Sequence, residues 1–134
     1  MGKAIPAGAR RGNVGLGSYQ GKALFKRLNE HAKSIEQAAN LDVQDFFCRY
    51  LVVDDIWIPL GESLLIEKLA PVWNRCLDGF GNHDPGSGRY AQERSPWDVV
   101  HPGRTWASRC AENKRSEEEI VAEVAAFIGQ HDSQ

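Results

Sequence analysis

Apolar residues recur with the period of an α-helix in two long segments of the first half of the chain. The first predicted helix runs from about Lys22 to Ala39, and its apolar face consists of Leu24, Leu28, Ala32 and Ile35. The second runs from about Leu60 to Trp73, with an apolar face of Leu64, Leu65, Leu69 and Val72. Pro71 should bend or shorten the second helix, because proline lacks a backbone N–H and clashes with the preceding turn.

The segments around these helices have other patterns. Residues 46–53 are aromatic and β-branched, which predicts a buried strand. The first eighteen residues read as a basic irregular loop. Residues 78–104 are rich in Gly, Pro, Asn and Asp, and they predict a long loop of the kind that a compact domain keeps for function.

The C-terminal part is predicted to be helical. Residues 106–110 are expected to form a short helical turn. Ser116 and Glu119 have the spacing of a capping box, which should open an amphipathic helix that continues through Ile128.

Composition places the chain among ordinary globular proteins. With 134 residues, 42% hydrophobic and 25% charged, we expect one domain over residues 1–134, with residues 108–134 as a C-terminal helical extension. No apolar run approaches the roughly 20 residues of a membrane span, so we expect a cytoplasmic protein without a membrane partner. The cysteines are too far apart for a zinc knuckle and should be buried thiols: Cys48, Cys76 and Cys110.

Charge is unevenly distributed, although the net charge is only −2. Residues 1–41 contain two acidic side chains, Glu30 and Glu36, and seven basic ones: Lys3, Arg10, Arg11, Lys22, Lys26, Arg27 and Lys33. Such a basic end suits an enzyme that grips phosphate at one place, and it also suits an ordinary solvated face. Lys3 is a candidate DNA contact at this end.

Arg27 and His31 are four residues apart on the first predicted helix, so they project from one face. Cleavage of a phosphodiester needs a cation beside the phosphate and a group that exchanges protons near neutral pH, and Arg and His supply these two functions. The alternative is an exposed arginine and an unremarkable histidine.

Glu62 lies in the first turn of the second predicted helix, where its carboxylate can hold Mg²⁺ or simply be surface charge near a helix N-terminus. Asn74 is a helix C-cap or a hydrogen-bonding support for the site. Residues 79–86 and 101–104 resemble recognition loops, in which Arg89 and Arg104 could pair with guanine. The alternative is two glycine-rich turns with solvent-facing arginines.

Taken in chain order, these segments resemble the small GIY-YIG type II restriction endonucleases that cut the palindrome CCGCGG, the Eco29kI group. The resemblance extends over nearly all of the chain to about Ala107. Its two specific strings are Asp-Asp-Ile-Trp-Ile-Pro-Leu at residues 54–60 and Gly-Phe-Gly-Asn-His-Asp-Pro-Gly at residues 79–86. The other matching elements are Gly2-Lys3-Ala4, Arg27-x-x-x-His31, Trp73-Asn74, Ser95-x-Trp97-Asp98 and His101-Pro102-Gly103-Arg104.

The resemblance implies a sequence-specific nuclease for double-stranded DNA. Arg27 would bind the phosphate, His31 would handle a proton, Glu62 would be the single ligand of Mg²⁺, and Asn74 would support the site. The recognition loops would add Asn82, His83, Arg89 and Arg104 as DNA contacts, and a palindromic target implies a homodimer. The implied fold is α/β, α+β in arrangement, with helices packed on a small antiparallel sheet.

In this family a β-hairpin with two tyrosines precedes the Gly-Lys-Ala step, whereas here Met1 stands directly before that Gly. We therefore expect the N-terminal hairpin to be missing and the chain by itself to be inactive or nearly so. We interpret Tyr19, which imitates the second tyrosine motif, as a chance match, because no first motif precedes it.

Rival functions differ in class. A truncated and catalytically dead remnant would act at most as a DNA-binding module. An HNH nuclease centred on Asn82, His83 and His101 lacks a second His–Asn element on a recognisable helix. A PD-(D/E)xK nuclease lacks a lysine two residues after Glu62 or Glu67.

Overall fold

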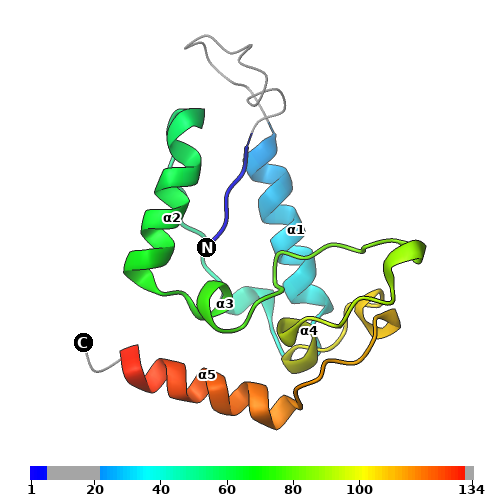
Figure 1. The fold of residues 1–134 in the computed structure, drawn as a ribbon. Helices are drawn as coiled ribbons and strands as arrows, with labels where there is room; N and C mark the ends of the chain where they lie inside the picture. The colour runs from blue at the N-terminus through cyan, green and yellow to red at the C-terminus, as the bar shows by residue number, and fades with distance from the viewer. Residues whose placement is uncertain (6–21, 132–134) are drawn as a thin grey trace.

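The computed structural model describes residues 1–5 and 22–131, and Figure 1 shows helices joined by irregular segments. The α-helices are α1 (Ala23–Gln37), α2 (Ile58–Leu69), α3 (Val72–Arg75), α4 (Pro96–Val100) and α5 (Glu117–His131). Within the described residues no strand forms, and only an isolated bridge joins Glu93 to Ala111. The expected antiparallel sheet is therefore absent from this part of the chain, and the α/β prediction is wrong for it. The predicted N-terminal loop and Tyr19 lie largely or wholly outside the described residues.

The segment predicted as a buried strand, residues 46–53, is irregular and exposed. Phe47 is 96% exposed and Val52 is 79% exposed. A strand needs a neighbour that accepts and donates its backbone hydrogen bonds, and none of the described residues supplies one. Aromatic and β-branched residues favour a strand, but they do not supply the adjacent strand with which it would pair. Cys48 is exposed as well, and of the three cysteines only Cys110 is fully buried.

The other predicted elements are present with small changes. The first and last helices agree with their patterns, and the second is divided in two. Ala70 ends α2 in the left-handed conformation, with φ 40° and ψ 51°, and Pro71 then precedes α3. The capping box is confirmed, because the Ser116 N–H donates to Glu119 Oε2 at 2.8 Å and the Glu119 N–H donates to Ser116 Oγ at 3.2 Å.

The core lies where α4 meets α5 and the C-terminal end of α1. Its buried members are Trp97 on α4, which is 0% exposed, Ile120 on α5, Leu77 and Ala38. Helix α4 falls within the predicted loop. Ser95 is its N-cap, and the Ser95 hydroxyl accepts a hydrogen bond from the Asp98 N–H. Because Ile120 is 1% exposed, the C-terminal helix completes this core instead of hanging from it.

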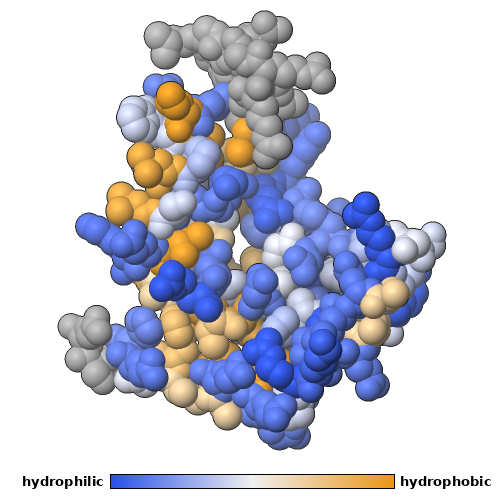
Figure 2. Space-filling view, viewed as in Figure 1, coloured by the Kyte–Doolittle hydropathy of each residue, from blue (hydrophilic) through white to orange (hydrophobic). Residues whose placement is uncertain are grey.

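Apolar side chains gather on the opposite side of the molecule, over α2, as Figure 2 shows. Exposed members include Ile56, Trp57, Leu60, Leu64 and Leu69. Within the described residues, no helix has the length and apolar character needed to cross a bilayer.

Candidate active site

Arg27 on α1 points toward the turn formed by residues 79–83. Its Nη1 lies 3.1 Å from Glu30 Oε2 and 3.4 Å from His83 Nε2. A Cβ atom at Gly81 would lie 3.0 Å from Arg27 Nη2, so the turn passes very close to the guanidinium. The Nε–H of Arg27 is buried and has no acceptor among the described residues. The Arg27 side chain is 26% exposed, and a partly exposed guanidinium of this kind is suited to binding an anion.

His31 lies one turn further along α1 and is half-buried. Its ring stacks on Phe80, with centroids 4.6 Å apart and an interplanar angle of 13°. Burial lowers the pKa of His31 to about 4, and the positive charge of Arg27 adds to the effect. The imidazole is therefore neutral at pH 7 and has a ring nitrogen free of a proton. A neutral imidazole can accept a proton, and here it lies one helical turn from the Arg27 guanidinium.

The first three residues bring the remaining predicted catalytic residues to His31. A Cβ atom at Gly2 would lie 3.3 Å from His31 Nε2. Lys3 Nζ lies 2.6 Å from Glu62 Oε2 on α2. In Figure 1 this N-terminal segment runs between α1 and α2. The N-terminal segment thus lies beside both His31, through Gly2, and Glu62, through Lys3, although 31 positions of sequence separate His31 from Glu62.

Asn74 on α3 joins the same group. The Met1 ammonium donates to Asn74 Oδ1 at 2.6 Å, and Asn74 Nδ2 donates to the Met1 carbonyl oxygen at 2.9 Å. The C-cap of α3 is Cys76, so Asn74 is not the helix cap that its sequence position allowed. Both ends of its amide hold the N-terminal segment.

The donor set around Glu62 fits a magnesium ion held mostly by water and phosphate. Within the described residues, no three His, Cys, Asp or Glu side chains come together as a metal cage. Mg²⁺ does not need one, because it commonly takes one or two carboxylates and keeps several waters. The Glu62 side chain is 18% exposed and already accepts a cation, the Lys3 ammonium. Its carboxylate is therefore accessible and directed toward positive charge.

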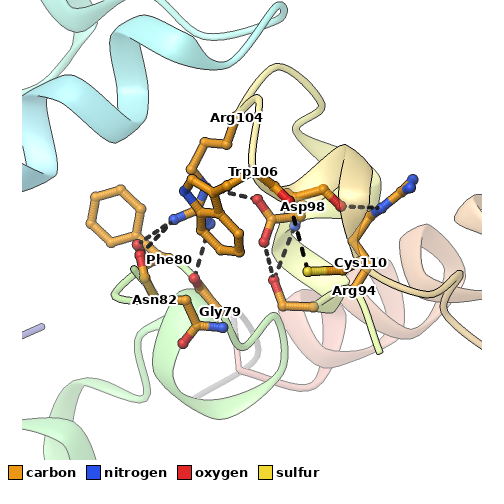
Figure 3. A network of polar contacts seen from close by, with 10 residues as sticks. Gly79, Phe80, Asn82, Arg94, Asp98, Arg104, Trp106 and Cys110 are labelled. Atoms are coloured by element: carbon orange, nitrogen blue, oxygen red, sulfur yellow. Dashed lines mark hydrogen bonds and ion pairs between the residues drawn. The ribbon is translucent and has the colours of Figure 1, made fainter. Parts of the chain in front are cut away.

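The two arginines predicted to read DNA have opposite environments. Arg89 lies exposed on the short helical turn Ser87–Arg89. Arg104 is 2% exposed, pairs with Asp98 and donates to backbone carbonyl groups (Figure 3). In this position Arg104 offers no contact to a base. The sequence of a glycine-containing turn gave no sign of this burial, because its partners come from residues 79–98.

The remaining loop residues are sorted by their partners. Asn82 and His83 are exposed, and His83 faces Arg27. His101 instead packs against Trp97 at 5.1 Å between ring centroids and hydrogen-bonds Asn40 through Nδ1, so it serves the interior. His83 and His101 thus have separate environments, which disfavours the HNH alternative.

A cluster at Asp84 closes the base of the loop that projects beyond His83. Asp84 Oδ1 accepts from the Gly86 N–H at 2.9 Å and from the Tyr90 hydroxyl at 2.8 Å, and Oδ2 pairs with Arg109 at 3.1 Å. The Arg109 guanidinium lies over the Tyr90 ring, 4.3 Å from its centroid. These donors, led by the Gly86 N–H, lower the pKa of Asp84.

Sequence reasoning did not identify Phe80 and Glu30 as members of the site. Glu30 is three residues from Arg27 on the same helix, a spacing that predicts contact. Phe80 belongs to one of the two specific strings, but only the folded chain shows that its ring covers His31.

Comparison with known proteins adds one match. A family model described as the Eco29kI GIY-YIG domain matches residues 1–128. A search among curated proteins finds none that matches.

Proposed function

The chain belongs to the Eco29kI GIY-YIG family of restriction endonucleases, and on this premise we propose that it is a type II enzyme that hydrolyses double-stranded DNA with Mg²⁺. The proposed target is a G·C-rich palindrome, CCGCGG. One observation carries the proposal: residues 1–3 contact His31, Glu62 and Asn74 together, and Arg27 lies one helical turn from His31.

Arg27 would bind the scissile phosphate. The Arg27 side chain is 26% exposed, so a phosphate oxygen can reach its cationic head and accept charge-assisted hydrogen bonds from it. Glu30 and His83 both contact Nη1 of this guanidinium and restrict its direction. A positioned cation of this kind stabilises the charge that develops in the transition state.

His31 would accept a proton from the attacking water, directly or through a neighbouring group. Because its pKa is about 4, it is unprotonated throughout the neutral range and has a ring nitrogen free to accept a hydrogen bond from the attacking water. Phe80 covers one face of the ring.

Glu62 would hold the metal, and Asn74 would fix the segment beside it. When bound, Mg²⁺ would polarise the phosphate and stabilise the charge on its oxygens. Lys3 pairs with Glu62 in the free protein, so we expect metal to displace the ammonium from that carboxylate. The released Lys3 would then be available to a DNA phosphate, as the sequence predicted.

The exposed side chains of the recognition loop would read the DNA. Asn82, His83 and Arg89 are exposed, and His83 lies beside Arg27. Because the proposed target is palindromic, two copies of the chain would bind it with two-fold symmetry.

The test compares cleavage with binding. The protein, prepared as the 134-residue chain and with any in-frame sequence that precedes it, is incubated with plasmids that contain or lack CCGCGG, in Mg²⁺ or in EDTA. We expect Mg²⁺-dependent cleavage at that sequence by at least one form. In that form, Glu62→Gln should reduce cleavage by about 100-fold or more and preserve binding in Ca²⁺.

Glu67→Gln is the matched control, since Glu67 is an exposed carboxylate on the same helix and should cut normally. Binding of CCGCGG without cleavage by either form would favour the DNA-binding module instead. Normal cleavage by Glu62→Gln would move the metal assignment to another carboxylate, with Asp55 and Glu67 next to be examined.

A further inference from the structure

Arg104 and Asp98 are the two buried charged residues of the described part of the chain. The Arg104 side chain is 1% exposed, and its Nε donates to Asp98 Oδ1 at 2.7 Å. The guanidinium carbon lies 4.2 Å from the centroid of Trp97 and 5.0 Å from that of Trp106. One carboxylate and two aromatic faces therefore fix the plane of the guanidinium, which leaves its outer donors pointing in one direction (Figure 3).

Those donors converge on a single turn of the backbone. Arg104 Nη2 donates to the Gly79 carbonyl at 3.0 Å, and Nη1 donates to the carbonyls of Phe80 at 3.3 Å and Asn82 at 3.0 Å. Gly79 has φ 118°, and a Cβ atom there would overlap Ser95. The turn therefore passes so close to Ser95 that residue 79 has no room for a side chain. The guanidinium therefore supplies most of the described polar contacts that hold this turn.

The same turn supplies one side of the candidate active site. Phe80 stacks on His31, Gly81 passes beside Arg27, and His83 Nε2 lies 3.4 Å from Arg27 Nη1. Arg104 therefore binds the carbonyl groups of Gly79, Phe80 and Asn82. The residues that face Arg27 and His31 are Phe80 itself and the neighbouring Gly81 and His83. A small shift of the turn would change both contacts together.

Burial of a charge for stability alone does not explain this arrangement. A buried ion pair is often no more stabilising than apolar residues of the same volume, and Trp97 and Trp106 already provide an apolar environment. Only the fork of N–H donors of an arginine can bind one carboxylate and three carbonyl groups at once. The contacts that distinguish Arg104 from an apolar residue are those to Asp98 and to the turn.

We propose that Arg104 is a positioning residue for the nuclease site: it holds residues 79–82 so that Phe80 covers His31 and His83 meets Arg27. This inference rests on the proposed function, because it assigns the turn to that site. Arg104 does not touch the reacting atoms, and it acts through the place that it gives to Phe80.

The pKa of His31 depends on whether the Phe80 ring covers the imidazole. Arg27 and Glu30 from α1, His83 from the loop and the Met1 ammonium all face the imidazole, and burial is the main cause of its pKa of about 4. Phe80 supplies the stacked contact on one face of the ring. When the turn moves away, water reaches the ring, and the pKa should rise toward its ordinary value of 6.5.

The test is an NMR titration of the histidine ring signals of the full chain, without DNA or metal. Arg104→Lys preserves a positive charge for Asp98 but cannot reach three carbonyl groups, so the pKa of His31 should rise from about 4 toward 6.5. Phe80→Leu, which removes the stacked ring directly, should raise it too. Arg109→Lys is the matched control: Arg109 also combines a carboxylate with an aromatic face, but it is an exposed residue of the helical turn Ala107–Arg109, and its replacement should leave His31 unchanged.

An unchanged His31 pKa in Arg104→Lys, together with a raised pKa in Phe80→Leu, would overturn the positioning role. If Arg104→Lys does not fold, Asp98→Asn takes its place, because it removes the charge that orients Arg104 and leaves every donor present. The titration needs no catalysis, so a chain that cuts no DNA can still support the inference, and an active nuclease can still refute it.

Discussion

Trp97 and Trp57 lie in two regions of the molecule that are packed very differently. Trp97 is 0% exposed among residues of α1, α4 and α5, whereas Trp57 is 55% exposed at the start of α2. The contrast extends to their surroundings, since Leu77 and Ile120 beside Trp97 are buried, whereas Ile56 and Leu60 near Trp57 are exposed.

The candidate active site joins these two regions. Arg27 and His31 come from α1, whose end packs into the core, and Phe80 packs against Trp97. Glu62 comes from α2, which contributes no buried residue, and it is tied to the site through Lys3. The comparison therefore indicates that the proposed phosphate-binding and proton-accepting side is fixed by the core, while the proposed metal-binding side is held by fewer contacts.

The largest expected effect compares the two tryptophans directly. Trp97→Ala should destabilise the chain by about 3–5 kcal/mol, because it leaves a cavity at the centre of the core. Trp57→Ala should cost about 1 kcal/mol or less, because water already reaches its ring. Urea unfolding of both variants measures the difference. Equal losses would show that the α2 region is packed as firmly as the core.

A smaller effect tests how the core fixes α1. Gly103 has φ 143°, and a Cβ atom there would overlap the carbonyl group of Gln37 at the end of α1. Gly103→Ala should therefore cost about 1–3 kcal/mol through strain. Gly88→Ala on the exposed loop meets nothing within 4 Å and should change the unfolding free energy by less than about 0.5 kcal/mol. Similar losses for the two variants would contradict a tight contact at Gln37.

The pH dependence of stability tests the junction itself. The folded-state pKa of His31, about 4, lies below its ordinary value of 6.5, so between these values the unfolded chain binds a proton that the folded chain does not. This contribution to stability is complete above pH 6.5 and is lost as the pH falls toward 4. His31→Gln should reduce the fall in the urea midpoint between pH 7 and pH 5. Burial also lowers the pKa of His101, so part of the fall will remain.

The smallest expected effect is a gain. Ala70 holds a left-handed conformation between α2 and α3 that costs a residue with a Cβ atom more than it costs glycine. Ala70→Gly should therefore stabilise the chain by about 0.5 kcal/mol. Ala126→Gly, within exposed helix α5, should instead destabilise it by about 1 kcal/mol. Destabilisation by Ala70→Gly would mean that the junction is not strained.

Local sequence signals predicted the elements whose stability is local. Helical periodicity located α1, the Ser116–Glu119 spacing located the start of α5, and Pro71 marked the break before α3. Helix α4 has its own signal, with Ser95 as N-cap and Pro96 at the first position, but the surrounding glycines and prolines concealed it.

Features that depend on distant partners were not predictable in the same way. Residues 46–53 have the composition of a strand, but composition does not specify the neighbouring chain that a strand needs. Arg104 follows a turn that is typical of the surface, and nothing near it in sequence shows that Asp98 and three carbonyl groups enclose it. The spacing of Arg27 and His31 indicated a pair on one face, whereas only the folded chain shows that residues 1–3 connect His31 with Glu62 and Asn74.

The cluster at Asp84 has a consequence for how such a protein can evolve. Arg104 fastens the turn at residues 79–82, and Asp84, Tyr90 and Arg109 independently close the loop beyond it. Insertions or substitutions in the tip at residues 87–89 would therefore leave the side that faces Arg27 and His31 intact. Selection could remodel the tip for a new target while the chemistry is inherited unchanged.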